Sequence, residues 1–194
     1  MGPSDGQLAR AAAAGDRPSF DELVRRHHRQ AMAVSYRLLG SSDDAAEVVQ
    51  DALLKAYRKL PTLQTPDAFA GWLMRIVRNL SLNRRRSRSL RSASSIDDEN
   101  AGPISSQAGT GTTGEQSVGS FDPARSAEGR ELGQHLQRAL EKLPERQRLA
   151  LVMFTMEDRP QKEIAEELGC SVEAVKWHVF QARKKLRDLL ANVM

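Results

Sequence analysis

The sequence predicts an all-α fold of two small helical domains joined by a long flexible linker, the second domain containing a helix-turn-helix. Aromatic residues make up 5% of the 194 residues, and strands draw heavily on aromatic and β-branched side chains, so the composition disfavours an all-β sandwich. Apolar residues recur at helical spacing on both sides of a Ser- and Gly-rich segment. We therefore expect an N-terminal domain at residues 16–90, a linker at 91–127 and a C-terminal domain at 128–191.

Three helices are expected in the N-terminal domain. The first carries an apolar face from Phe20 onward and stops at Gly40. The second has Ser42 as its N-cap and ends at Pro61. The third opens at Pro66 and runs into a stretch of three arginines. Its polar side chains that we expect outside the core are Arg75, Arg78, Asn79 and Asn83.

The segment between the domains has the composition of a disordered linker. Ser and Gly make up roughly a third of Ser92–Ser126, and large apolar residues are almost absent, so burial could not offset the entropy of ordering it. We expect the free protein to sample many separations of its two domains.

Four helices are expected in the C-terminal domain, over Leu132–Leu143, Glu145–Met156, Gln161–Leu168 and from Ser171 to about Leu190. Gly169 permits a left-handed turn between the last two helices, and the serine that follows can cap the last one. A helix, a short turn containing Gly and a second helix are typical of a helix-turn-helix.

The last helix has the pattern of a DNA recognition helix. Its valines and leucines lie on one face, so Trp177, Gln181 and Lys184 point outward. In a major groove, Gln can pair with adenine and Lys with guanine or a phosphate. A helical hairpin within a bundle is the alternative, but it leaves exposed Trp177 and Phe180 unexplained.

Three stretches of the chain match the motifs of one known family. Leu143–Leu190 begins with Leu-Pro-Glu-Arg and contains Ala-Arg-Lys-Lys-Leu near its end, and it resembles the C-terminal domain of the extracytoplasmic-function (ECF) sigma factors of bacterial RNA polymerase. Asp43–Leu60 is similar to the helix by which this family docks on polymerase. Phe69–Arg86 is similar to the helix that melts and reads the −10 element of the promoter.

The resemblance implies a sigma factor that binds core RNA polymerase through its β′ and β subunits, directs it to specific promoters and helps open the DNA. It places the pocket for a flipped base in the loop Thr62–Asp67, and it allows an anti-sigma factor as a further partner. The implied contact residues are Asp44, Glu47, Gln50 and Asp51 for polymerase; Arg75, Arg78, Asn79, Asn83, Arg84 and Arg85 for the −10 element; and Lys176, Trp177, Phe180, Gln181, Arg183 and Lys184 for the −35 element.

Some features depart from the family pattern. Trp177 and His178 stand where the family usually has a small residue and then Arg, and Gln181 stands where a basic residue is common. We therefore expect an unusual promoter preference. The linker is also longer than is usual in the family, and the middle domain of housekeeping-type sigma factors is missing.

Other residues point to no further chemistry. His27 and His28 have no partner at metal-ligand spacing, and Cys170 is expected to pack as a small hydrophobe. No nucleophile motif or phosphate loop is present, so we expect no enzyme activity and no cofactor. We find neither a signal peptide nor an apolar run of ~18 residues, which predicts a cytoplasmic protein without membrane insertion. Trp72 is either a core residue or a platform for stacking a base.

Two other functions stay open on the sequence. One is a stand-alone helix-turn-helix transcriptional regulator that binds an operator through residues 145–190. The other is a decoy that imitates a sigma factor and binds an anti-sigma factor without touching DNA. The arginines of the third helix and the basic last helix argue against a decoy, because a decoy needs no DNA surface.

Overall fold

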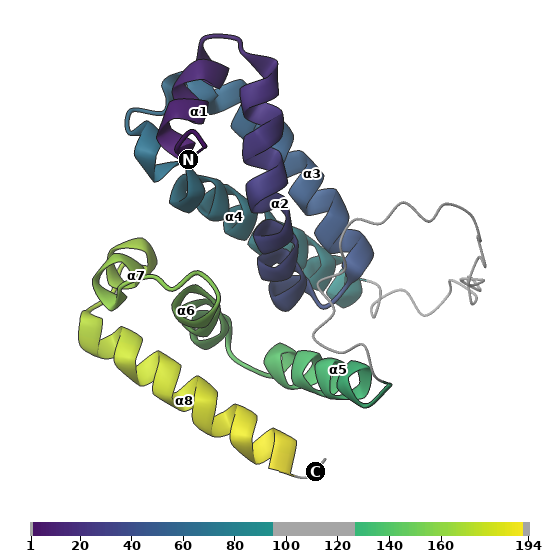
Figure 1. The fold of residues 1–194 in the computed structure, drawn as a ribbon. Helices are drawn as coiled ribbons and strands as arrows, with labels where there is room; N and C mark the ends of the chain where they lie inside the picture. The colour runs from purple at the N-terminus through teal and green to yellow at the C-terminus, as the bar shows by residue number, and fades with distance from the viewer. Residues whose placement is uncertain (1, 95–126, 192–194) are drawn as a thin grey trace, which may run out of the picture.

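The computed structural model describes residues 2–94 and 127–191, and most of the expected linker at 91–127 lies outside the described residues. Within the described part every regular element is a helix, so the expected all-α class is confirmed. Figure 1 shows two groups of helices, α1 to α4 from the N-terminal half and α5 to α8 from the C-terminal half.

The N-terminal domain is a bundle in which α2, α3 and α4 all pack on one another. Its elements are α1 (Asp5–Ala13), α2 (Arg17–Leu39), α3 (Ser42–Lys59), the short 3₁₀ helices η1 (Leu60–Thr62) and η2 (Pro66–Ala68), and α4 (Phe69–Ser94). The largest apolar side chains buried between them are Leu23, Val34, Leu38, Val49, Phe69, Leu73 and Met74. These residues hold the exposed faces of α3 and α4 in fixed positions.

Local signals set the helix ends, with two corrections to the expected boundaries. Gly40 ends α2 in a left-handed conformation with φ 80°, as expected. Ser41, and not Ser42, caps α3, because Ser41 has extended backbone and its Oγ accepts from the backbone N of Asp44 at 3.2 Å. Pro66 opens η2 rather than the long helix, which begins at Phe69.

Helix α1 was not anticipated from the sequence, and it adds packed structure before residue 16. Ser4 and Gln7 form a capping box, in which Ser4 N donates to Gln7 Oε1 at 2.8 Å and Gln7 N donates to Ser4 Oγ at 3.2 Å. Leu8 and Ala9 are buried in the core of the N-terminal domain. The Ser-x-x-Gln spacing was the available signal for this helix.

The C-terminal domain contains the expected helix-turn-helix. Its helices are α5 (Ala127–Glu141), α6 (Glu145–Thr155), α7 (Gln161–Leu168) and α8 (Val172–Ala191). Gly169 is left-handed with φ 61°, and Ser171 Oγ accepts from the backbone N of Ala174 at 3.1 Å. Val175 and Val179 of α8 are buried against α6 and α7, as the apolar stripe predicts.

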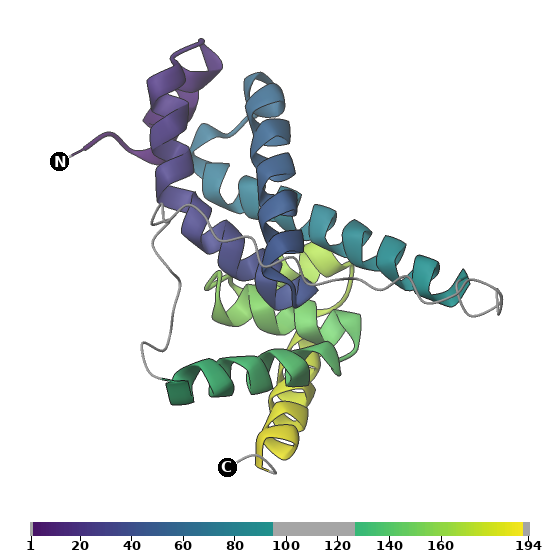
Figure 2. The same ribbon diagram turned by 90° about the vertical axis from the view of Figure 1, so that its right-hand side faces the viewer.

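The two domains also pack directly against each other, through α2 on one side and α5 and α6 on the other. In Figure 2 the green helices lie against the end of α2. Leu149 and Val152 of α6 are buried in the same apolar cluster as the N-terminal core. Arg148, 1% exposed, donates to the backbone O of Leu38 at 3.3 Å and to that of Leu143 at 2.9 Å. This burial lowers the pKa of Arg148 to about 10.

The turn of the helix-turn-helix gives a prediction about stability. A Cβ on Gly169 meets nothing within 4 Å, so the cost of Gly169→Ala comes from its positive φ alone. We expect a loss of about 1 kcal/mol or more in the free energy of unfolding, measured by urea denaturation. Gly169→Asn serves as the control and should lose less, because Asn tolerates this conformation. Equal losses in the two variants contradict the explanation.

Candidate nucleic-acid interface

The outer face of α8 exposes two aromatic rings among cationic side chains. Trp177 is 53% exposed and Phe180 is 62% exposed, although both sit one turn or less from buried valines. Lys176, Arg183 and Lys184 are also exposed, and Gln181 is half-buried. The expected outward orientation of the aromatic side chains is therefore observed. The cations of this surface can attract phosphates, and its exposed rings can pack on apolar groups at the edges of bases. The surface therefore suits a nucleic acid.

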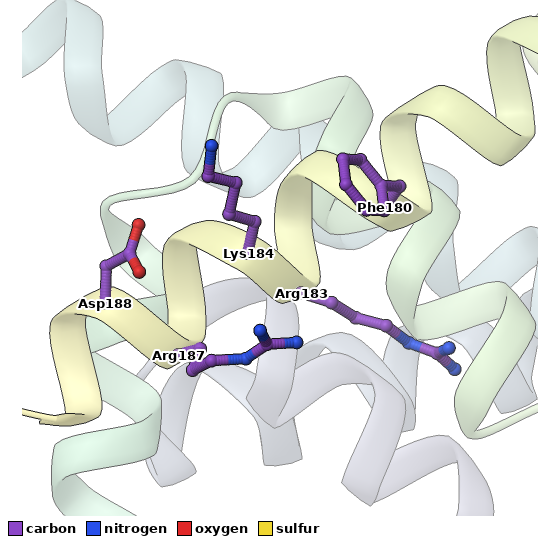
Figure 3. Close-up of a pocket in the computed structure, with 5 residues that line it drawn as sticks. All are labelled: Phe180, Arg183, Lys184, Arg187 and Asp188. Atoms are coloured by element: carbon purple, nitrogen blue, oxygen red, sulfur yellow. The ribbon is translucent and has the colours of Figure 1, made fainter.

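An open hollow runs along this part of α8, lined by Phe180, Arg183, Lys184, Arg187 and Asp188. Figure 3 shows Arg183 and Arg187 on one side of the helix, with Lys184 and Asp188 on the other. The guanidinium carbon of Arg183 lies 5.3 Å from the centre of the Phe154 ring on α6. This cation–π contact orients Arg183 before any ligand arrives.

The predicted −10 residues of α4 fall into three groups in the structure. Arg75, Asn79 and Asn83 are exposed, as expected. Arg84 and Arg85 are half-buried. Arg78 is only 1% exposed, and its expected outward position is wrong. The reason is that α4 is covered on that side by the C-terminal domain, a contact between distant segments that a helical wheel does not show.

Arg78 is the centre of an ionic cluster between the domains. Its Nε and Nη2 donate to Glu167 Oε1 at 3.1 and 2.5 Å, and its Nη1 pairs with Glu157. Arg159 also pairs with Glu167. The side chains of Arg78 and Glu157 are each 2% exposed. Because Arg78 and Glu157 are almost completely removed from water, each of these two charges depends on its partners.

The pKa values of the two carboxylates in the cluster are shifted in opposite directions. Burial raises the pKa of Glu157 above its usual range, and the pairing with Arg78 only partly opposes this. Burial also acts to raise the pKa of Glu167, but the hydrogen bonds from Arg78 and Arg159 prevail and leave that pKa lowered. Glu167 is therefore the carboxylate that favours the ionised form.

A second ionic cluster joins the predicted polymerase surface to the predicted −10 surface. Arg84 of α4 donates from Nε to Asp44 Oδ1 at 3.0 Å and from Nη1 to Glu47 Oε1 at 2.8 Å. Arg88 Nη1 lies 3.3 Å from Asp44 Oδ2. Three residues expected to face two different partners thus pair with one another across α3 and α4.

The remaining polymerase residues lie on an open face of α3. Gln50 and Asp51 are exposed, and Leu54 on the next turn is 49% exposed. Leu54 was not predicted as a contact residue from the sequence. Its position away from the apolar face of the predicted helix was a usable signal. Tyr57, further along α3, is 45% exposed, and its ring packs edge-on against Phe20 with 4.9 Å between the ring centroids.

The loop Thr62–Asp67 connects η1 to η2 beside the start of α4. Gln64 and Thr65 are exposed at its tip. Trp72 is half-buried and packs on Phe69, with 5.9 Å between ring centroids. Of its two interpretations, the core role fits this contact better than a platform for stacking a base.

The residues considered for metal or redox chemistry have structural partners. His27 Nε2 lies 2.6 Å from Asp5 Oδ2, and Cys170 packs at the edge of the C-terminal core. Across residues 2–94 and 127–191, the structure places no three His, Cys, Asp or Glu side chains close enough to hold a metal ion. Nor is any helix of that part long and apolar enough to cross a membrane.

Comparison with known proteins matches both domains. The model of sigma-70 region 2 matches residues 23–91, and that of sigma-70 region 4 matches residues 134–186. The chain is 33% identical to the ECF RNA polymerase sigma factor SigE of Mycolicibacterium smegmatis, covering 98% of this chain and 70% of that protein. It is 31% identical to the ECF RNA polymerase sigma-E factor of Escherichia coli, covering 94% and 92%.

A solved structure shares the arrangement. CnrH, determined in complex with the cytosolic domain of CnrY, superposes with a TM-score of 0.65 at 25% identity, covering 98% of this chain and 99% of CnrH. The likeness therefore includes both domains.

The interdomain cluster predicts a difference between two matched substitutions at pH 7. Glu167→Gln removes an ionised acceptor shared by Arg78 and Arg159, whereas Glu157→Gln removes a carboxylate that burial disfavours. We expect Glu167→Gln to cost about 1 kcal/mol more free energy of unfolding, measured by urea denaturation. Equal costs contradict the assignment of Glu167 as the main partner.

The same pair should respond to pH. A lowered pKa contributes stability above the unfolded value of 4.5, and this contribution is lost as the pH falls through the folded value. The difference between the two variants should therefore shrink below pH 4.5.

Proposed function

Since the chain belongs to the ECF sigma factors of bacterial RNA polymerase, which bind the core enzyme and direct it to promoters, we propose that its two domains divide promoter recognition. Helix α8 reads the −35 element, and α4 with the loop before it binds the −10 element. The observation that carries this proposal is the exposure of Trp177 and Phe180 among the cations of α8.

On α8, the side chains divide by chemistry into positioning and reading groups. Lys176, Arg183 and Lys184 contact phosphates, which fix the helix in the groove without specifying a sequence. Phe180 packs on a thymine methyl group, and Gln181 pairs with adenine. The exposed face of the Trp177 ring covers the neighbouring base-pair step.

On α4, the exposed residues Arg75, Asn79 and Asn83 meet the separated promoter strand, together with Arg85. An arginine surface beside unstacked bases provides the electrostatic part of single-strand binding. Arg78 and Arg84 join this surface only after their carboxylate partners move away. The loop Thr62–Asp67 accepts a flipped base.

On α3, the polymerase-binding residues are Asp44, Glu47, Gln50 and Asp51. The apolar Leu54 adds to this surface, since a half-exposed leucine in the middle of a polar face suits a protein contact. Docking on polymerase competes with Arg84 for Asp44 and Glu47, so it frees that arginine for DNA.

The two domains must separate for this recognition to take place. Promoter −10 and −35 elements lie about 25 base pairs apart, or about 80 Å along the duplex. A chain as long as residues 95–126 spans at most about 110 Å when fully extended, which is enough to bridge that distance. The packed arrangement shares one apolar cluster between the domains and pairs Arg78 with Glu157 and Glu167. We assign it to the chain before it binds polymerase.

The family also supports the absence of catalysis, since its members are transcription initiation factors. We propose that the chain is not an enzyme, uses no cofactor and acts in the cytoplasm beside polymerase. A regulatory partner such as an anti-sigma factor fits the closed arrangement, and CnrH was solved with the cytosolic domain of CnrY bound.

The proposal for α8 is tested on promoter DNA with the polymerase holoenzyme. Gln181→Ala should reduce discrimination at one −35 base pair by ~1–3 kcal/mol, whereas Arg183→Ala should weaken all sequences alike and lower the salt dependence. Arg138→Ala is the control, because Arg138 is an exposed arginine on a different helix, α5. Unchanged discrimination in Gln181→Ala contradicts the role of Gln181 in reading a base. Specific binding of duplex promoter DNA by the free chain, without polymerase, favours a stand-alone regulator instead.

The proposal for α3 is tested by binding to core polymerase. Gln50→Ala with Asp51→Lys should weaken core binding by ~2 kcal/mol or more while leaving the helical content unchanged, because both side chains are exposed. Asp21→Lys on α2 is the matched charge reversal at another exposed position. Unchanged affinity in the double variant contradicts the assignment of α3.

A further inference from the structure

Helix α1 lies against η2, the turn that ends the loop Thr62–Asp67 (Figure 1). Gly6 is buried at this contact. A Cβ on Gly6 would lie 1.8 Å from Asp67 Oδ1 and 3.2 Å from Asp67 Cα. The Asp67 side chain must therefore turn away from a larger residue, and because Asp67 Cα is backbone, η2 must also shift by a few tenths of an ångström.

The same helix is fixed to α2 on its other side. Asp5 Oδ2 lies 2.6 Å from His27 Nε2, and Asp5 Oδ1 accepts from Arg26 Nη1 at 2.9 Å. Hydrogen bonds from Arg26 and His27 lower the pKa of Asp5 although burial opposes this. Leu8 and Ala9 bury the apolar face of α1 in the domain core. A helix held in this way can act as a rigid support.

The loop itself has few supports of its own. Neither η1 nor η2 has a side-chain cap. The backbone hydrogen bonds lie at the loop's two ends, from Leu63 N to Leu60 O at 3.0 Å and from Ala68 N to Thr65 O at 2.9 Å. The shape of the exposed tip at Gln64 and Thr65 therefore depends on what packs against η2, and α1 packs on η2 more extensively than α4 does.

We propose that α1 is a positioning element for promoter opening and that Gly6 determines its fit. Through Gly6 and the pair between Arg10 and Asp67, at 3.5 Å, it holds the loop in the shape that accepts an unpaired base of the −10 strand. This inference rests on the proposed function, because it assumes that the loop receives such a base. Because extruding a base from the duplex costs free energy, a loop that already has the shape to accept the base favours promoter opening.

The test compares glycine substitutions in the full chain bound to core polymerase. Gly6→Ala is compared with Gly133→Ala, a helical glycine in α5 whose added Cβ would meet nothing within 4 Å. The readouts are core affinity, the preference among bases at each −10 and −35 position, and the rate of opening measured with a fluorescent base at −10. A base preference is a readout that a loss of stability alone does not change.

We expect Gly6→Ala to reduce discrimination among −10 bases by about tenfold and to slow opening, while core affinity and −35 preference stay as in the control. Arg10→Gln, a substitution on the exposed surface that leaves α1 folded, should produce a smaller change of the same kind. If both variants keep the −10 preference of the control, the role of α1 is overturned.

Substitutions of the loop separate this inference from the proposed function. Gln64→Ala and Thr65→Ala change exposed side chains at the tip. If these two variants change the −10 preference and Gly6→Ala does not, only the support by α1 is wrong. If the loop variants have no effect either, the loop does not receive a base, and both proposals about it fail.

Discussion

The arrangement of the two domains depends on one buried guanidinium. Arg78 lies in the middle of α4, where its side chain is 2% exposed, and the carboxylates that satisfy it come from the C-terminal domain. An unpaired charge in such a place is very unfavourable, so the position of α4 fixes where Glu157 and Glu167 must be. Arg148 makes the reverse connection: it belongs to the C-terminal domain, on α6, and donates to the backbone at the end of α2 in the N-terminal domain. Between these two arginines, Leu149 and Val152 complete a core that neither domain fills alone.

This geometry divides the proposed DNA surfaces into one that is covered and one that is open. On α4, Arg78 and Arg84 are both neutralised, the first by the other domain and the second by Asp44 and Glu47. On α8, Trp177 and Phe180 remain exposed because the domain interface uses α5 and α6 instead. These two rings therefore do not dock on the N-terminal domain in this structure. The closed chain presents its −35 surface while part of its −10 surface is paired internally.

What the sequence predicts well is what depends on neighbours along the chain. The helix-turn-helix follows from Gly169 and Ser171, whose conformations are set by residues within one turn. The capping box of α1 was equally local, but its short alanine-rich run gave no strong apolar face. Arg78 could not be placed in this way, because its partners lie 79 and 89 residues further along the chain. A helical wheel shows one buried face, whereas α4 is covered by its own domain on one side and by the C-terminal domain on another.

A buried ion pair gives an interface a definite geometry more than it gives it strength. Removing one partner of Arg78 leaves an uncompensated charge in the interior, which is costly. Moving the domains apart is different, because Arg78, Glu157 and Glu167 all regain water and the loss of pairing is largely offset by hydration. The main cost of opening is then the exposure of apolar side chains such as Leu149 and Val152. A partner that covers this apolar surface can supply that energy, and under the proposed function that partner is core polymerase.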